Sequence, residues 1–160
     1  TDNHTTAVGV TDKDKYVIVK VNQNNEHEVY CNDLLFYKFK NLNQSNDFTV
    51  FYDKSLHHWL VIGNLGEGIL ITSSGRYEEF KFSKISFENL NYAVFHKDKI
   101  FLPQDGSLIT YDIHKQNEKL IQLDNFIYSN SRVIVTKTGF KIISGSKIYT
   151  FTINKNNNNN

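Results

Sequence analysis

The stretch Asp105–Ile113 (DGSLITYDI) decides the fold class of this 160-residue chain, because a similar stretch recurs at Ser144–Ile153 (SGSKIYTFTI) with one inserted residue. In both, a glycine-containing turn opens a run of β-branched and aromatic side chains, which is typical of a hairpin turn followed by a strand. A shorter copy is Glu67–Thr72 (EGILIT), and a degenerate one is Asn32–Tyr37 (NDLLFY). The four copies predict a repeated strand-turn-strand unit.

The spacing of the copies sets the size of this unit. The turn anchors are 35, 38 and 39 residues apart, at Asp33, Gly68, Gly106 and Gly145. An apolar strand precedes each turn, and a further strand precedes that one. Three or four antiparallel strands in roughly 35 to 45 residues form the unit of a β-propeller blade. We therefore predict an all-β chain of antiparallel meander repeats, a β-propeller or propeller fragment, with a β-trefoil and a β-sandwich as alternatives.

Two short motifs resemble known propeller repeats. Gly106–Ile113 (GSLITYDI) is similar to the inner-strand turn of degenerate blades of the kelch, PQQ-like and F-box-associated types. Leu56–Leu60 (LHHWL) is similar to the aromatic strand before that turn. The paired glycines of kelch blades and the Trp-Asp ending of WD40 blades are absent. The resemblance implies a propeller-like scaffold over Tyr16–Ile153.

Composition divides the chain into three segments. Residues 1–15 are polar, residues 16–153 carry about four repeat units, and residues 154–160 are an Asn-rich tail that we expect to be disordered. One short helix is predicted near Lys84–Leu90. Four short blades would just close a ring. The missing initiator Met and the Asn tract favour a piece of a larger propeller.

Charge and cysteine content bound the partners and the compartment. Eighteen Lys and Arg against seventeen Asp and Glu give a formal charge of +1, which argues against nucleic acid or a membrane surface as partner. The alternation in Phe36–Lys40 (FYKFK) is explained by a half-buried strand. No apolar run is long enough to span a membrane. Cys31 is the single cysteine and cannot form an internal disulfide, which favours a reducing, cytoplasmic compartment.

Motifs for catalysis are absent from the sequence. It has no nucleophile elbow, no phosphate loop and no Cys-x-x-Cys. His57 and His58 are adjacent, so on a strand they face opposite sides and do not readily share a metal ion. We predict no catalytic, cofactor-binding or metal-binding residues, which disfavours an enzyme.

A repeat scaffold without catalytic residues predicts a non-enzymatic protein-interaction module that binds another protein through inter-strand loops. The candidate loops are Asn41–Asp47, Gly63–Gly68, His114–Glu118 and Ser129–Ser131. The candidate contact residues are Trp59, His57, His58, Asn64 and Glu67. For Trp59 a role in the core is favoured over one as an interface anchor. Two alternatives remain: a fragment of an enzyme or carbohydrate-binding β protein whose site lies partly outside this chain, and a fragment without autonomous function. The oligomeric state is left open.

Overall fold

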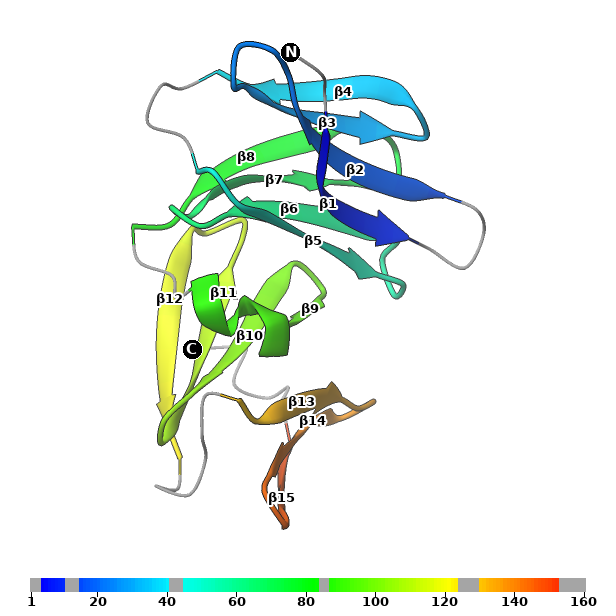
Figure 1. The fold of residues 1–160 in the computed structure, drawn as a ribbon. Coiled ribbons are helices and arrows are strands. Elements are labelled where there is room, and N and C mark those ends of the chain that lie inside the picture. Colours follow the sequence, from blue (N-terminus) through cyan, green and yellow to red (C-terminus); the bar gives the residue numbers. More distant parts are fainter. Residues whose placement is uncertain (1–3, 11–14, 41–44, 84–86, 124–129, 153–160) are drawn as a thin grey trace. The chain divides into compact units, whose positions relative to one another are not determined.

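The computed structural model describes residues 4–10, 15–40, 45–83, 87–123 and 130–152, and these residues confirm the all-β class (Figure 1). The strands are β1 (His4–Val10), β2 (Tyr16–Val21), β3 (His27–Cys31), β4 (Leu34–Phe39), β5 (Phe48–Asp53), β6 (His58–Gly63), β7 (Glu67–Ile71), β8 (Tyr77–Lys81), β9 (Val94–His96), β10 (Lys99–Gln104), β11 (Ser107–Asp112), β12 (Asn117–Gln122), β13 (Arg132–Val135), β14 (Gly139–Ser144) and β15 (Lys147–Thr152).

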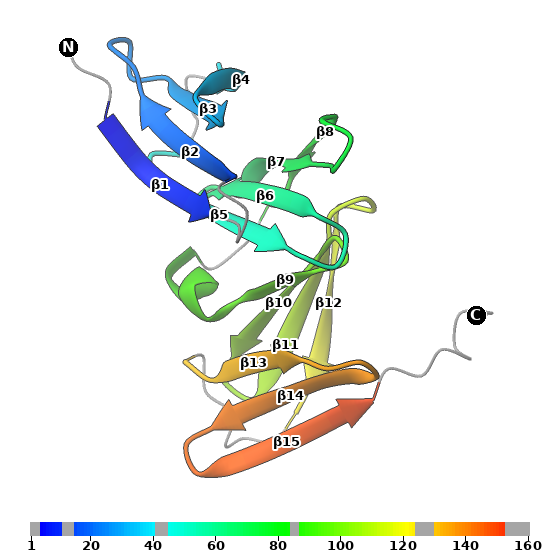
Figure 2. The same ribbon diagram turned by 90° about the vertical axis from the view of Figure 1, so that its right-hand side faces the viewer.

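The strands form antiparallel meander sheets, in which each strand pairs with its neighbours in the chain. Within the described residues the sheets are β1-β2-β3-β4, β5-β6-β7-β8, β9-β10-β11-β12 and the three-stranded β13-β14-β15. Figure 2 shows the last of these as two successive hairpins. The predicted antiparallel meander is therefore present in every sheet.

The repeat is visible in the backbone as well as in the sequence. The turn between the second and third strands of each sheet contains a residue with positive φ, at intervals of 41, 40 and 39 residues: Asn25 (φ 59°), Gly66 (93°), Gly106 (73°) and Gly145 (60°). Glycine and asparagine are the residues that most readily adopt this left-handed conformation. The unit is thus a meander of about 40 residues.

This backbone period corrects the first two predicted turn anchors. Asp33 lies in the turn between β3 and β4, one hairpin too late, while the equivalent residue of the first sheet is Asn25. Gly68 lies inside β7, two residues after the true turn residue Gly66. The first copy was misaligned because its turn uses Asn where the other copies use Gly.

Two further elements differ from the sequence expectations. Strand β1 pairs with β2 from His4↔Val21 to Val10↔Tyr16, although the segment before residue 16 was expected only to be polar. The short helix predicted near Lys84–Leu90 is a 3-10 helix, η1, at Phe87–Tyr92. The Asn-rich tail at 154–160 lies outside the described residues.

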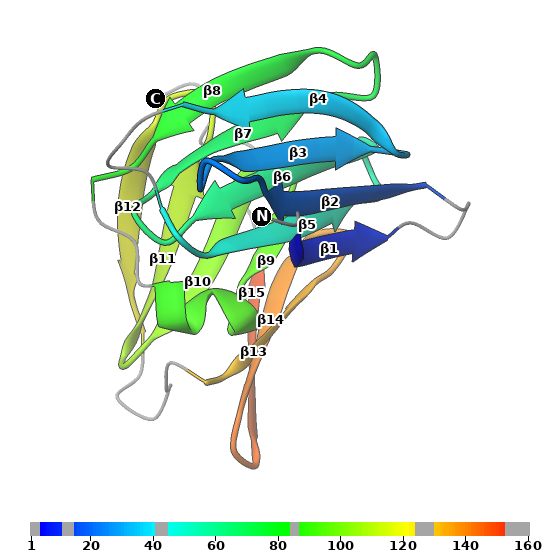
Figure 3. The ribbon, with the colours of Figure 1, turned by 45° about the horizontal axis from the view of Figure 1, so that its top comes forward.

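The chain divides into two compact units, which are described separately below. Unit 1 is Thr1–Phe87 with Ile113–Asn117, and unit 2 is Glu88–Asp112 with Glu118–Asn160. In unit 1 the sheets β1–β4 and β5–β8 lie face to face (Figure 3). Their shared core contains residues that alternate along β2, β6 and β7, as expected for strands that bury one face between two sheets: Val17, Val19, Trp59, Val61, Ile69 and Ile71.

Unit 2 has its own core between the sheets β9–β12 and β13–β15. Its buried members are Phe101, Leu108, Val133, Phe140 and Ile142. Among the residues that the structure describes, no helix has the length and apolar character to cross a membrane.

Candidate functional site

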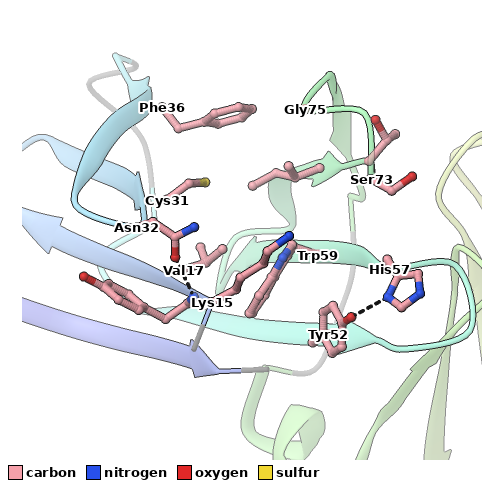
Figure 4. Close-up of a pocket in the computed structure, with 13 residues that line it drawn as sticks. Lys15, Val17, Cys31, Asn32, Phe36, Tyr52, His57, Trp59, Ser73 and Gly75 are labelled. Carbon is pink, nitrogen blue, oxygen red and sulfur yellow. Dashed lines mark hydrogen bonds between the residues drawn. The ribbon is translucent and has the colours of Figure 1, made fainter. Parts of the chain in front are cut away.

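A pocket of about 460 Å³ opens between the two sheets of unit 1, at the end that carries the β5–β6 and β7–β8 turns (Figure 4). We call it the aromatic pocket. It is lined by Lys15, Tyr16, Val17, Cys31, Asn32, Phe36, Tyr52, His57, Trp59, Ile71, Thr72, Ser73 and Gly75. Pockets of this size and mainly apolar lining are typical of sites that take a small ligand or one large side chain.

Trp59 forms one wall of the aromatic pocket and also belongs to the core. Its side chain is 9% exposed and packs against the same cluster as Val61. The Tyr52 ring lies beside it, with ring centroids 4.7 Å apart and planes tilted by 48°. The structure therefore places Trp59 in the core, with its remaining exposure directed to the pocket.

Polar groups at the pocket are held by hydrogen bonds. His57 lies in the β5–β6 turn with φ 55°, and its Nδ1 is 2.8 Å from the Tyr52 hydroxyl. On the facing sheet, Asn32 Oδ1 accepts from the Tyr16 backbone N–H at 3.0 Å, while the Asn32 N–H donates to the Tyr16 carbonyl at 3.1 Å. These contacts orient the side chains of His57 and Asn32.

Cys31 gives the pocket a thiol of low reactivity. Burial raises the pKa of Cys31 from 9.0 to about 11. The thiolate is the nucleophilic and metal-binding form, so at neutral pH this side chain acts as a small apolar group. Cys31 therefore adds to the apolar surface of the pocket, which suits binding rather than nucleophilic chemistry.

An exposed apolar rim extends the aromatic pocket outward. Leu34 lies opposite Cys31 in the β3–β4 ladder, and Tyr77 lies opposite Ile71 in the β7–β8 ladder. Directly opposed residues share a face of the sheet, so Leu34 and Tyr77 lie on the same faces as the pocket. Leu34 is 74% exposed and Tyr77 is 49% exposed. Phe36 joins the two features, since it lines the pocket and its ring centroid is 5.8 Å from that of Tyr77.

The five predicted contact residues separate into two places. His57 and Trp59 line the aromatic pocket, whereas His58 begins β6 half-buried and is not among the lining residues. Asn64 and Glu67 lie at the opposite end of β6 and β7. The sequence analysis therefore grouped residues that lie at opposite ends of β6.

Asn64 and Glu67 organise a turn. Glu67 accepts hydrogen bonds from the backbone N–H of Ser45, at 2.7 Å, and from the Ser45 hydroxyl. The Ser45 Oγ accepts from the Leu65 N–H at 2.7 Å, and Asn64 Nδ2 donates to Asn46 Oδ1 at 2.9 Å. Of the other candidate loops, residues 41–44 and 129 lie outside the described part of the chain.

Most residues of the aromatic pocket were missed from the sequence. Tyr52, Phe36 and Ile71 come from three strands of two sheets, and no local spacing links them. The adjacent pair Leu34-Leu35 was a usable signal, because one of two successive strand residues must face away from the core. Among the described residues no group of three or more His, Cys, Asp or Glu side chains could hold a metal ion.

Comparisons with known proteins do not assign the chain to a family. No family model and no curated protein matches it. Two solved structures are similar: the extracellular domain of a protein described as a one-component system of B. thetaiotaomicron (12% identity, TM-score 0.44, 95% of this chain and 24% of that one), and the complex of the fission yeast SREBP–SCAP binding domains (15% identity, TM-score 0.43, 88% of this chain and 44% of that one). The chain thus spans less than half of either structure, and both TM-scores are too low to identify a fold family.

Proposed function

We propose that this chain is a non-enzymatic protein-interaction module, and that the aromatic pocket with its apolar rim is its docking site. The observation that carries the proposal is the continuity between a preformed pocket of about 460 Å³ and two exposed side chains, Leu34 and Tyr77, on the same sheet faces. Adjoining exposed apolar groups of this kind are a mark of interaction sites.

The lining indicates the chemistry of the partner. Tyr52, Trp59 and Phe36 provide apolar surface, while the hydroxyls of Thr72 and Ser73 lie in the adjoining turn. One large apolar side chain of a partner, Leu or Phe, would bury its surface against the aromatic rings. The neighbouring peptide groups of the partner would meet the turn hydroxyls. Such an anchor in a desolvated pocket is the usual energetic centre of a protein interface.

The scaffold interpretation follows from the repeat. We infer propeller-like blades, an interpretation supported by the turn period of 41, 40 and 39 residues and by four-stranded meanders. In such scaffolds the strands are fixed and the turns carry the contacts, as the β5–β6 and β7–β8 turns do at this pocket. We further propose a cytoplasmic location, which the single cysteine supports.

The experiment uses Trp59, the single Trp of the chain, as its reporter. Peptides are selected by display against the purified chain, and their binding is followed by Trp59 fluorescence. We expect peptides with a Leu or Phe anchor that change the Trp59 emission. Leu34→Asp should weaken their binding by about tenfold, because it places a charge beside the apolar anchor.

Leu120→Asp is the matched control, since Leu120 is 53% exposed on β12 and belongs to unit 2. It should leave binding unchanged. Equal losses in the two variants, or selected peptides that bind Leu34→Asp normally, would contradict the proposed site. Maltotriose is a further probe: a change in Trp59 emission that depends on Leu34 would favour the carbohydrate-binding alternative.

A further inference from the structure

A second pocket of about 460 Å³ lies within unit 2, between the sheets β9–β12 and β13–β15. We call it the lysine pocket. It is lined by His96, Lys97, Lys99, Phe101, Thr110, Lys119, Ile121, Val135, Thr136, Lys137, Thr138, Gly139 and Phe140. Like the aromatic pocket, it lies between two sheets that follow one another in the chain. It lies at the end of these sheets where the first and second strands of each are joined, by the β9–β10 and β13–β14 turns.

The two pockets occupy equivalent positions between neighbouring repeat units, but the residues that line them differ in charge. Four lysines and three threonines are among the residues that line the lysine pocket, and its lining contains no Asp or Glu. The aromatic pocket has one lysine. The fold alone therefore does not require a cationic lining here. The charge of the chain is also divided unequally: unit 2 has eight Lys and Arg and six Asp and Glu, whereas unit 1 has ten and eleven.

The lysines are presented by a fixed backbone. Lys137 and Thr138 form the two-residue turn closed by the Thr136 N–H to the Gly139 carbonyl, at 2.8 Å. Thr136 Oγ1 accepts from the Gly139 N–H at 3.1 Å, so its own hydrogen can donate to a ligand. Gly139 must remain Gly, because a Cβ there would lie 2.0 Å from the Phe151 carbonyl oxygen.

On the opposite side of the lysine pocket, the lysines lie on paired strands or in the turn that joins two of them. Lys99 begins β10, opposite His96 on β9, and Lys119 lies on β12 with its carbonyl 3.5 Å from the Thr110 hydroxyl. Lys97 and Asp98 have φ 47° and 62°, the backbone that a two-residue type I′ turn between β9 and β10 requires. Asp112 opposes Lys99 across the β10–β11 ladder, so its carboxylate lies on the same face of the sheet as Lys99.

We propose that the lysine pocket binds a small molecule bearing a phosphate monoester. Lysine has three donors and no acceptor and binds phosphate as a point charge. A phosphate monoester, with its charge near −2 and three acceptor oxygens, matches several such cations better than one carboxylate does. Phe101, Ile121, Val135 and Phe140 form an apolar floor that suits an aromatic or aliphatic body on the phosphate.

Phenyl phosphate is the probe, titrated calorimetrically into the full chain at low ionic strength. We expect saturable binding that is tighter than that of inorganic phosphate. The double variant Lys119→Gln with Lys137→Gln should weaken binding by about tenfold. The matched control is Lys141→Gln with Lys147→Gln, which removes the same charge from exposed lysines outside the lining and should change affinity by less than about twofold.

Three results would overturn the assignment. They are the absence of saturable binding, equal losses in both double variants, and a dT12 oligonucleotide that binds more tightly than phenyl phosphate with the same dependence on Lys119 and Lys137. The last result would identify a nucleic-acid surface. Leu34→Asp should leave phenyl phosphate binding unchanged, so this test is independent of the peptide site proposed for unit 1.

Discussion

The backbone carbonyl oxygen of Phe82 lies 2.0 Å from the position that a Cβ on Gly66 would occupy, and the Phe82 N–H donates to the Gly66 carbonyl at 2.8 Å. Gly66 has φ 93°. The close approach therefore requires a residue without a side chain. Gly66→Ala should lower the free energy of unfolding of unit 1 by more than about 3 kcal/mol, because it adds a steric clash to a left-handed backbone. Urea denaturation followed by Trp59 fluorescence measures the change.

Gly75→Ala is the control for this prediction. Gly75 has φ 83°, but a Cβ there would meet no atom within 4 Å. Only the left-handed strain remains, so we expect a loss of about 1 to 2 kcal/mol. Equal losses at the two glycines would show that the Phe82 carbonyl can move aside at little cost.

Asn25 tests the corrected repeat. It is the equivalent of Gly66 in the first sheet and has φ 59°. Asn25→Gly should keep or slightly raise the midpoint of urea denaturation, whereas Asn25→Ala should lower the free energy of unfolding by about 1 kcal/mol. If Ala were tolerated as well as Gly, a left-handed turn residue at this position would not be needed.

Glu67 should contribute to the free energy of unfolding, because its carboxylate accepts hydrogen bonds from Ser45, a residue that is only 1% exposed. Glu67→Ala removes the acceptor for a buried N–H and hydroxyl, and we expect a loss of about 1 to 3 kcal/mol in the free energy of unfolding. Glu79→Ala is the comparison, since Glu79 accepts from the Tyr37 hydroxyl at 2.9 Å in an exposed position. A thermal melt of Glu67→Ala that matches that of Glu79→Ala would return Glu67 to the candidate contact residues.

Cys31 predicts a pH dependence of stability at the alkaline end. Its folded-state pKa of about 11 is above the unperturbed 9.0 because of burial. The folded state therefore holds the thiol proton more tightly than the unfolded state does. The contribution is fully present below pH 9 and is lost as the pH rises through about 11.

The comparison with Cys31→Ala isolates this effect from that of Tyr111, whose pKa burial raises to about 12. Urea midpoints measured between pH 8 and pH 11 should fall more steeply for the natural chain than for Cys31→Ala. Parallel curves would mean that the thiol is solvated in the folded state.

The fold class was accessible from the sequence because strands and glycine turns leave local signals. The turns at Gly106 and Gly145 were correctly identified, and the strands on either side of each turn pair as antiparallel hairpins. The first repeat was misaligned, since Asn25 supplies the left-handed turn without a glycine. Strand β1 was missed because its sequence (HTTAVGV) has few large apolar residues to mark a strand.

The candidate site was only partly accessible for a different reason. His57 and Trp59 were selected because they lie two residues apart in the aromatic segment Leu56–Leu60, and both line the aromatic pocket. Asn64 and Glu67 were selected from a glycine-rich loop, and the structure shows that their side chains satisfy local backbone and hydroxyl groups. Leu34 was not recognised as a neighbour of the pocket, because its pairing with Cys31 depends on the register of β3 and β4. That register cannot be predicted from the sequence of one strand alone.

The left-handed residues His57 and Lys97 set a limit on how far this molecule can be stabilised. Each lies in the first hairpin turn of its sheet and lines one of the two pockets. A glycine at either position would relieve backbone strain but remove a side chain from the lining of a pocket. Under the two proposals above, stability and binding therefore make opposite demands on these two residues, and a thermostable variant would have to take its gains from turns away from both pockets.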